Sequence, residues 1–142
     1  MNREAAYAAL FSLLSGLKTA GTVKIADRRV KLLSQMNGPE LPALFMAVDH
    51  QGIKPSASRP VIRTYGAKVY LYAANPDKHT SADIALNGLI DAVEAILLAP
   101  PGQTQTLGGV VAHAWIEGTI EIFPGALGER AAAIIPIQML VP

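Results

Sequence analysis

The chain has 142 residues, the size of one ordinary domain, and 51% of them are hydrophobic, so it can bury a substantial core. Its 12 Lys and Arg residues nearly balance 11 Asp and Glu residues. The resulting formal net charge of +1 argues against a protein whose main function is to bind nucleic acid. The lack of cysteine excludes disulfides, thiolate metal sites and a thiol nucleophile.

Residues 2–18 are predicted to form a helix, with Asn2 as its cap and Gly21 as its stop. One apolar stripe at helical spacing supports this, formed by Ala6, Leu10, Leu13, Leu14 and Leu17. The stretch is shorter than the roughly 20 apolar residues that span a bilayer, and no signal-peptide cleavage site follows it. We therefore expect a soluble protein that is cytoplasmic where it is made, with no membrane partner.

The middle of the chain is predicted to form strands separated by turn residues. Strands are expected over 22–33, 43–50 and 61–74, the last with a bulge or bend at Gly66. Residues 37–42 should turn, and 51–60 should form a loop because its prolines, serines and cations leave little to bury.

A second helix is predicted over residues 81–98, with a start signal at Thr80 and Asp83. The residues expected to be buried are Leu86, Leu89, Ile90, Val93 and Leu97. The residues expected on the solvent-exposed face are Asp83, Asn87, Asp91 and Glu94. Two prolines then end the helix and open a loop over 99–109.

Residues 110–122 alternate between an apolar and a largely polar set, which is typical of a half-buried strand. Such a strand reaches about 40 Å, whereas a domain of this size is roughly 37 Å across. A two-residue hairpin at Glu117-Gly118 would instead mix polar with apolar residues on one face. One long strand, bent at Gly118, is therefore the preferred prediction.

The last strand is predicted over 130–142, and Pro136 should make it an edge or place a bulge there, since proline cannot donate to a ladder. The order of elements predicts an α+β fold over 1–142 as a single domain. We expect a largely antiparallel twisted sheet with two main helices packed on one face and long projecting strands.

The sequence carries no motif for catalysis, metal binding or a cofactor. None of His50, His79 and His113 is paired at i+2 or i+4 with another histidine or a carboxylate on the same face of a helix, and no nucleophile elbow, phosphate loop or dinucleotide fingerprint occurs. Glu117 and Glu121 share a strand face about 13 Å apart, more than the roughly 5–9.5 Å of a glycosidase pair. We expect no enzyme activity and no cofactor, and a binding or assembly role remains.

Two surface features leave alternatives open. Trp115, flanked by His113 and Glu117 on the polar face, is either an interface anchor or covered by a loop of its own chain. Arg28, Arg29 and Lys31 form a basic cluster that is either solvated or matched to an acidic patch on a partner.

The chain resembles the tail terminator, or tail completion, family of long-tailed bacteriophages. The resemblance rests on "LIDAVEAIL", a Pro-Gly loop, "QTLGG", "IEGTIEI" and "GALGERAAAIIPIQMLVP", with "RRVKLLSQMNGPELPALFMAV" nearer the N-terminus. It implies a structural virion protein that forms a ring, usually a hexamer, at the head-proximal end of the tail tube. The implied partners are other copies of the chain, the tail tube protein and the head-completion or connector protein, and DNA passes through the bore without specific binding.

Within this family reading, His113, Trp115, Glu117 and Glu121 are candidate lumen or subunit-interface residues. Carboxylates lining a bore would repel phosphate, so that DNA slides without sticking. Candidate partner-contact loops carry Lys54 and Arg59 in one case and Gln103 and Gln105 in the other, although both loops could be spacers. The alternatives are another phage neck or tail joining protein of related fold, a small-ligand binding domain, or a hydrolase using the carboxylates.

Overall fold

The computed structural model describes residues 2–55, 57, 61–75, 81–124 and 129–141. The elements in chain order are α1 (Arg3–Leu14), α2 (Gly16–Thr19), β1 (Ile25–Asp27), the 3-10 helices η1 (Leu33–Gln35) and η2 (Gly38–Glu40), β2 (Ala43–Lys54), β3 (Ile62–Ala74), α3 (Ala82–Leu97), β4 (His113–Ile116), β5 (Glu121–Pro124) and β6 (Arg130–Val141). Among these described residues, no helix has the length and apolar character needed to cross a membrane.

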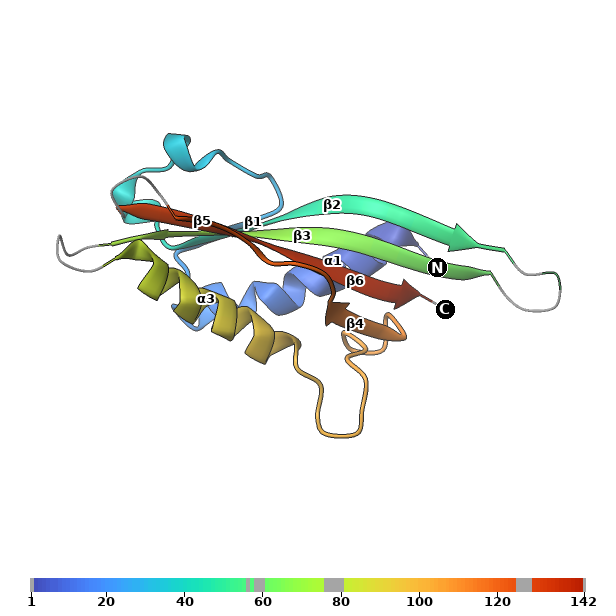
Figure 1. The fold of residues 1–142 in the computed structure, drawn as a ribbon. Helices are drawn as coiled ribbons and strands as arrows, with labels where there is room; N and C mark the ends of the chain where they lie inside the picture. Colours follow the sequence, from blue (N-terminus) through green and yellow to red (C-terminus); the bar gives the residue numbers. More distant parts are fainter. Residues whose placement is uncertain (1, 56, 58–60, 76–80, 125–128, 142) are drawn as a thin grey trace.

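The strands form one six-stranded sheet in the order β1-β2-β3-β6-β4, with β5 also paired to β6. Every pairing is antiparallel except that of β1 with β2. Helices α1 and α3 lie on one face, while the segment containing η1 and η2 lies on the other (Figure 1). The predicted α+β fold with a largely antiparallel sheet and helices on one face is confirmed.

The main core lies between the sheet and the helices, and β6 shows most simply how the sequence produces it. Burial alternates residue by residue along β6, so that Ile135, Ile137 and Met139 face the helices and are fully buried. A smaller cluster on the opposite face packs Met36 and Leu41 against Phe45 and Tyr72. The sheet is thus covered fully on the helix side and partly on the other.

Both predicted helices are confirmed, although the first is divided at Ser15 into α1 and α2. The side chain of Asn2 caps α1 by accepting a 2.8 Å hydrogen bond from the backbone N–H of Glu4. The chain leaves α2 at Gly21, whose φ of 82° lies in the left-handed region that glycine tolerates. All five residues of the predicted apolar stripe of the second helix are buried in α3.

The strand predicted over 22–33 is mostly wrong, because only Ile25–Asp27 enters the sheet. The following segment turns away and covers the second face, held by hydrogen bonds that its backbone carbonyls accept from side chains of the sheet. The Tyr72 hydroxyl donates to Lys31 O at 2.7 Å, and the Arg130 guanidinium donates to Leu33 O and Met36 O. These long-range bonds outweigh the local alternation that favoured a strand.

The strand predicted over 43–50 continues to Lys54, so the loop predicted from residue 51 begins too early. Residues 56 and 58–60 of that loop lie outside the described part of the chain. The irregularity expected at Gly66 lies in the partner strand, because β2 shifts register between Val48 and Gln51, directly opposite Gly66.

The single long strand predicted over 110–122 is only partly correct, because it begins at His113 and is divided into β4 and β5, which continue in the same direction on either side of Gly118. β4 and β5 both pair antiparallel with β6, one after the other, which excludes the hairpin alternative. The interruption contains Gly118, at φ 104°, and lies opposite Pro136, which has no N–H to donate. β6 is a central strand, so the prediction of an edge strand at Pro136 is wrong: the proline is accommodated by the break in its neighbour.

Candidate functional site

His113 and Trp115 lie two apart on β4, half-buried, with their rings stacked at a centroid distance of 5.0 Å. The backbone N–H of Gln105 donates to His113 Nδ1 at 3.1 Å, and the backbone N–H of Ala114 donates to Gln105 O at 2.9 Å. The loop after α3 therefore runs alongside β4 and fixes the histidine ring. Trp115 is partly covered by its own chain and keeps part of its surface available to a partner.

A cavity of about 580 Å³, open to solvent, lies between the C-terminal end of α3, the following loop and β4. Its lining includes Glu94, Pro101, His113 and Trp115. It does not include Glu117 or Glu121, so the structure does not bring the candidate carboxylates together with His113 in one closed cleft.

Glu117 and Glu121 lie along the outer border of the sheet and are both exposed. The backbone N–H of Glu117 donates to Pro136 O at 3.2 Å, which holds the interruption between β4 and β5 against β6. Glu121 begins β5 and pairs with Ile134. The two carboxylates therefore mark the same sheet border at two separate points.

The four loop candidates differ in their surroundings. Lys54 is exposed at the end of β2, Gln103 is exposed in the loop after α3, and Arg59 lies outside the described residues. Gln105 is half-buried, and its side chain donates to Leu97 O and accepts from the backbone N–H of Leu107. Gln105 braces the loop, whereas Lys54 and Gln103 present their side chains to solvent.

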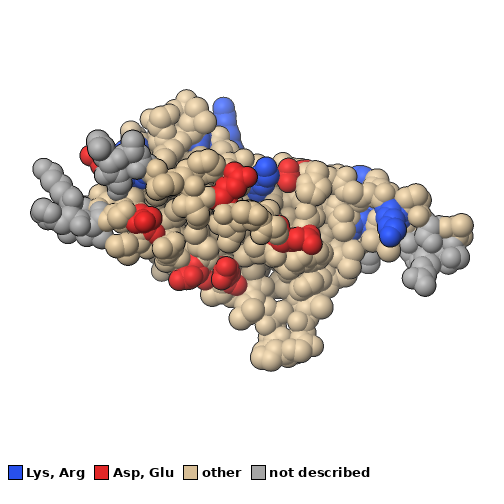
Figure 2. Space-filling view, in the orientation of Figure 1, with Lys and Arg blue, Asp and Glu red and all other residues tan. Residues whose placement is uncertain are grey.

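Charge is unevenly distributed over the surface. Only acidic charges appear over α3 in the lower part of the view, while Lys and Arg lie along the upper part and at the end near the β2–β3 hairpin (Figure 2). α3 carries Asp83, Asp91 and Glu94 and no Lys or Arg. The basic cluster seen in the sequence is largely internal in its contacts, because Arg28 pairs with Glu4 and Lys31 Nζ lies 3.8 Å from Glu40.

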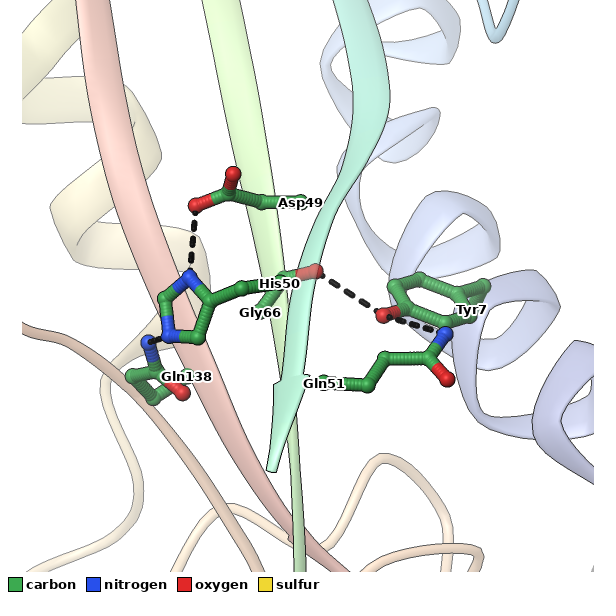
Figure 3. A network of polar contacts seen from close by, with 6 residues as sticks. All are labelled: Tyr7, Asp49, His50, Gln51, Gly66 and Gln138. Atoms are coloured by element: carbon green, nitrogen blue, oxygen red, sulfur yellow. Dashed lines mark hydrogen bonds and ion pairs between the residues drawn. The ribbon is translucent and has the colours of Figure 1, made fainter. Parts of the chain in front are cut away.

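A polar network lies at the register shift of β2, at a place where Gly66 was the only residue that the sequence singled out (Figure 3). The Gln138 amide donates to His50 Nε2 at 3.1 Å, so the other ring nitrogen donates to Asp49 at 3.0 Å. Gly66 of β3 lies between His50 of β2 and Gln138 of β6, and it pairs with Gln138. Because Gly66 has no side chain, the His50 ring covers it and links β2 to β6.

A second chain of hydrogen bonds ties α1 to the same place. Tyr7 OH donates to Gly66 O at 2.9 Å, Gln51 Nε2 donates to Tyr7 OH at 3.3 Å, and Arg3 donates to Gln51. Burial raises the pKa of Tyr7 and, at the other end of the sheet, that of Tyr72, since desolvation disfavours the phenolate.

Stability is therefore expected to fall as the pH rises above about 10, the ordinary tyrosine pKa. In that range the unfolded chain releases the Tyr7 proton while the folded chain retains it, so the free energy of unfolding decreases with pH. Urea unfolding at several alkaline pH values should show a shallower pH dependence for Tyr7→Phe than for the wild type, and shallower still for Tyr7→Phe with Tyr72→Phe. Equal slopes in all three proteins would contradict this expectation.

The described residues contain no group of three or more His, Asp or Glu side chains placed to hold a metal ion. The His50–Asp49 pair has its second ring nitrogen occupied by the Gln138 amide. This arrangement fixes three strands together and leaves no lone pair of the imidazole facing a substrate.

No family model matches the chain, and no curated protein matches it. Among solved structures, the chain is similar to one in the virion of a native gene transfer agent particle, with a TM-score of 0.55, 9% sequence identity, and coverage of 94% of this chain and 92% of that chain. A second solved chain, whose name states no function, is similar over 100% of this chain and 96% of its own, with a TM-score of 0.52 and 16% identity. At these identities the likeness establishes a shared fold over nearly the full length.

Proposed function

We propose that the chain is a structural virion protein, and specifically a tail terminator that caps the head-proximal end of a phage tail tube as a ring. The observation that carries the proposal is the likeness, over 94% of the chain, to a component of a phage-like virion particle. The resemblance of the C-terminal third to tail terminators points to the same setting independently.

The surface is consistent with a subunit whose contacts are made with other chains. Large apolar side chains remain exposed at several places, among them Ile53, Ile84, Leu98 and Phe123. Exposed apolar residues next to charged ones are typical of surfaces that another protein covers. In a hexameric ring each subunit contacts its two neighbours through two different surfaces, because the contact is heterologous: a patch on one subunit binds an unlike patch on the next.

In this proposal the ring ends polymerisation of the tube and forms the joint with the head-completion proteins, and DNA passes through its bore. The protein acts by binding and holds no cofactor. It is found in the virion, at the head-proximal end of the tail, after assembly in the cytoplasm of the bacterial host.

Electron microscopy of tails made with and without the protein tests the role. In its absence, tails should be uncapped and over-long, and they should not join to heads. Complementation with the full chain should restore tails of one length. Tails of normal length that still fail to join heads would overturn the terminator role and favour the second candidate, another neck or tail joining protein.

The cavity beside His113 and Trp115 keeps a small-ligand binding domain as a further candidate. Its open form and mixed lining distinguish it from ligand sites, which bury most of the ligand surface. A stable monomer that binds small molecules in this cavity and has no effect on tails would favour that reading over the virion role.

A further inference from the structure

Two surface patches at opposite ends of the sheet match each other in chemistry. The hairpin patch consists of Ile53, Lys54, Ile62 and Arg63, where β2 and β3 approach their connection. The edge patch consists of Glu117, Glu121, Ile122 and Phe123, along the border formed by β4 and β5. Each patch has two large apolar residues and two charges, and the charges are of opposite sign.

All four apolar side chains are exposed to a degree that is costly in water. Ile53 is 55% exposed and Ile62 is 42% exposed, while Ile122 and Phe123 are 44% and 50% exposed. Covering these surfaces would gain hydrophobic free energy in proportion to the apolar area removed from water. Four of the eight large apolar side chains that are exposed among the described residues belong to these two patches, and the other four, Leu32, Val48, Ile84 and Leu98, lie elsewhere. Each patch therefore pairs its charges with apolar surface that a partner could cover.

The strand registers place the residues in matching arrangements. Lys54 pairs with Ile62 and Ile53 pairs with Arg63, so each face of the hairpin presents one isoleucine beside one cation. In β5, Glu121 and Phe123 are two residues apart and share a face. A carboxylate beside an aromatic ring is a suitable counterpart for an ammonium group beside an isoleucine.

The two patches cannot satisfy each other within one subunit. Arg63 pairs with Val141, whereas Glu121 pairs with Ile134, so the patches are about 23 Å apart along β6. Ion pairs between described residues involve Arg28, Lys31 and His50 and no residue of either patch. The complementary charges are therefore available to a second copy of the chain.

Each patch also includes residues of a strand that lies on a sheet edge. Beyond Phe45, β2 has no described strand on its outer side, and β5 is paired only with β6 among the described strands. An edge strand offers unpaired backbone groups to a neighbouring chain, and the charges beside it determine which neighbour can approach.

We propose that the hairpin patch of one subunit docks on the edge patch of the next, and that this heterologous contact closes the ring. The inference rests on the proposed function and deepens it: Glu117 and Glu121 belong to the subunit interface, and they are not the repelling lining of the bore. A contact between unlike patches repeats around a ring, and its charged part weakens with added salt.

A charge exchange between two double variants of the full-length protein tests the contact. The Lys54→Glu, Arg63→Glu variant has two acidic patches, and the Glu117→Lys, Glu121→Lys variant has two basic ones. Each alone should lose self-association by more than about tenfold, because like charges meet at every contact. Mixed in equal amounts, they should return to the wild-type mass, because subunits that alternate around an even-numbered ring restore opposite charges at every contact.

Size-exclusion chromatography with light scattering gives the masses over a concentration series, and circular dichroism checks that each variant is folded. Where the free wild-type chain is a monomer, capped tails are counted instead after expressing the variants singly and together. The matched control is Asp91→Lys with Glu94→Lys, which makes the same charge change on exposed residues of α3. This control should assemble like the wild type.

The outcomes separate the interface from the proposed function. Wild-type rings together with unaffected patch variants would overturn the interface and leave the terminator role standing. Normal rings of Glu117→Lys, Glu121→Lys that fail only in DNA delivery would place these carboxylates in the bore and likewise overturn the interface. Loss of rings in the α3 control with no loss in the edge variant would assign the acidic partner surface to α3. A wild type that neither assembles nor caps tails would overturn both proposals.

Discussion

Replacing Ile135 with alanine is expected to lower the free energy of unfolding by about 2–5 kcal/mol, the range found for truncating large aliphatic side chains in filled cores. Ile135 is 0% exposed and pairs with Val69 of β3, which is also 0% exposed. Its strand is held on one side by β3 and on the other by β4 and β5, so the backbone cannot close the cavity easily.

Urea unfolding followed by circular dichroism measures this loss, at one protein concentration because assembly would add to the apparent stability. The matched control is Ile84→Ala, the same substitution at a helix position that is 63% exposed. It should change the free energy of unfolding by no more than about 0.5 kcal/mol. Equal losses in the two variants would contradict the assignment of Ile135 to the core.

The parts of the fold that the sequence predicts well are those with a strong local period. The stripe of α3 repeats at helical spacing, so burial there follows directly from residue type. Burial also alternates along β6, but the residues of β6 are almost all apolar, so the face on which each one lies follows from the strand geometry and not from residue type. The absence of a hairpin at Glu117-Gly118 was also predictable, because a hairpin there would have placed Glu121 opposite an apolar residue. The division of the strand predicted over 110–122 into β4 and β5 was not predicted.

The parts that the sequence does not predict depend on contacts between distant residues. The segment after Asp27 alternates like a strand, yet its carbonyls are held on the second face by Tyr72 and Arg130. The central position of β6 is equally nonlocal, since the break that accommodates Pro136 belongs to another strand. Local propensity carries no information on either arrangement.

For the candidate surface residues, too, some features can be predicted from the sequence and others appear only in the structure. Alternation predicts that Glu117 and Glu121 lie on the polar side of the strand over 110–122, and both are exposed, as are Gly118 and Ile122 of the predicted apolar set. Only the strand registers reveal that the two cations and two isoleucines of the hairpin patch are neighbours and lie at the other end of the sheet. The network of Tyr7, His50 and Gln138 had a single sequence signal, Gly66, which marks the place where another strand's side chain must fit.

Gly66→Ala is expected to lower the free energy of unfolding by about 1–3 kcal/mol, the usual loss when a filled site must accept an extra carbon. A Cβ atom at this position would lie 3.0 Å from the His50 carbonyl oxygen and 3.2 Å from Cε1 of its ring. The ring can move only by giving up its contact with Gln138, and the carbonyl can move only with the backbone of β2. The strand irregularity and the glycine opposite it therefore depend on each other.

The control substitution is expected to raise the free energy of unfolding instead of lowering it. Gly88→Ala changes an exposed glycine of α3 whose added Cβ would meet nothing within 4 Å, and it should stabilise the protein by up to about 1 kcal/mol through helix propensity. In a His50→Ala background, Gly66→Ala should cost less than in the wild type, because the ring is gone, but it should still cost something because the carbonyl remains. A full cost in that background would assign the clash to the backbone alone, whereas no cost in the wild type would show that β2 adjusts freely and that Gly66 is not required by its neighbour.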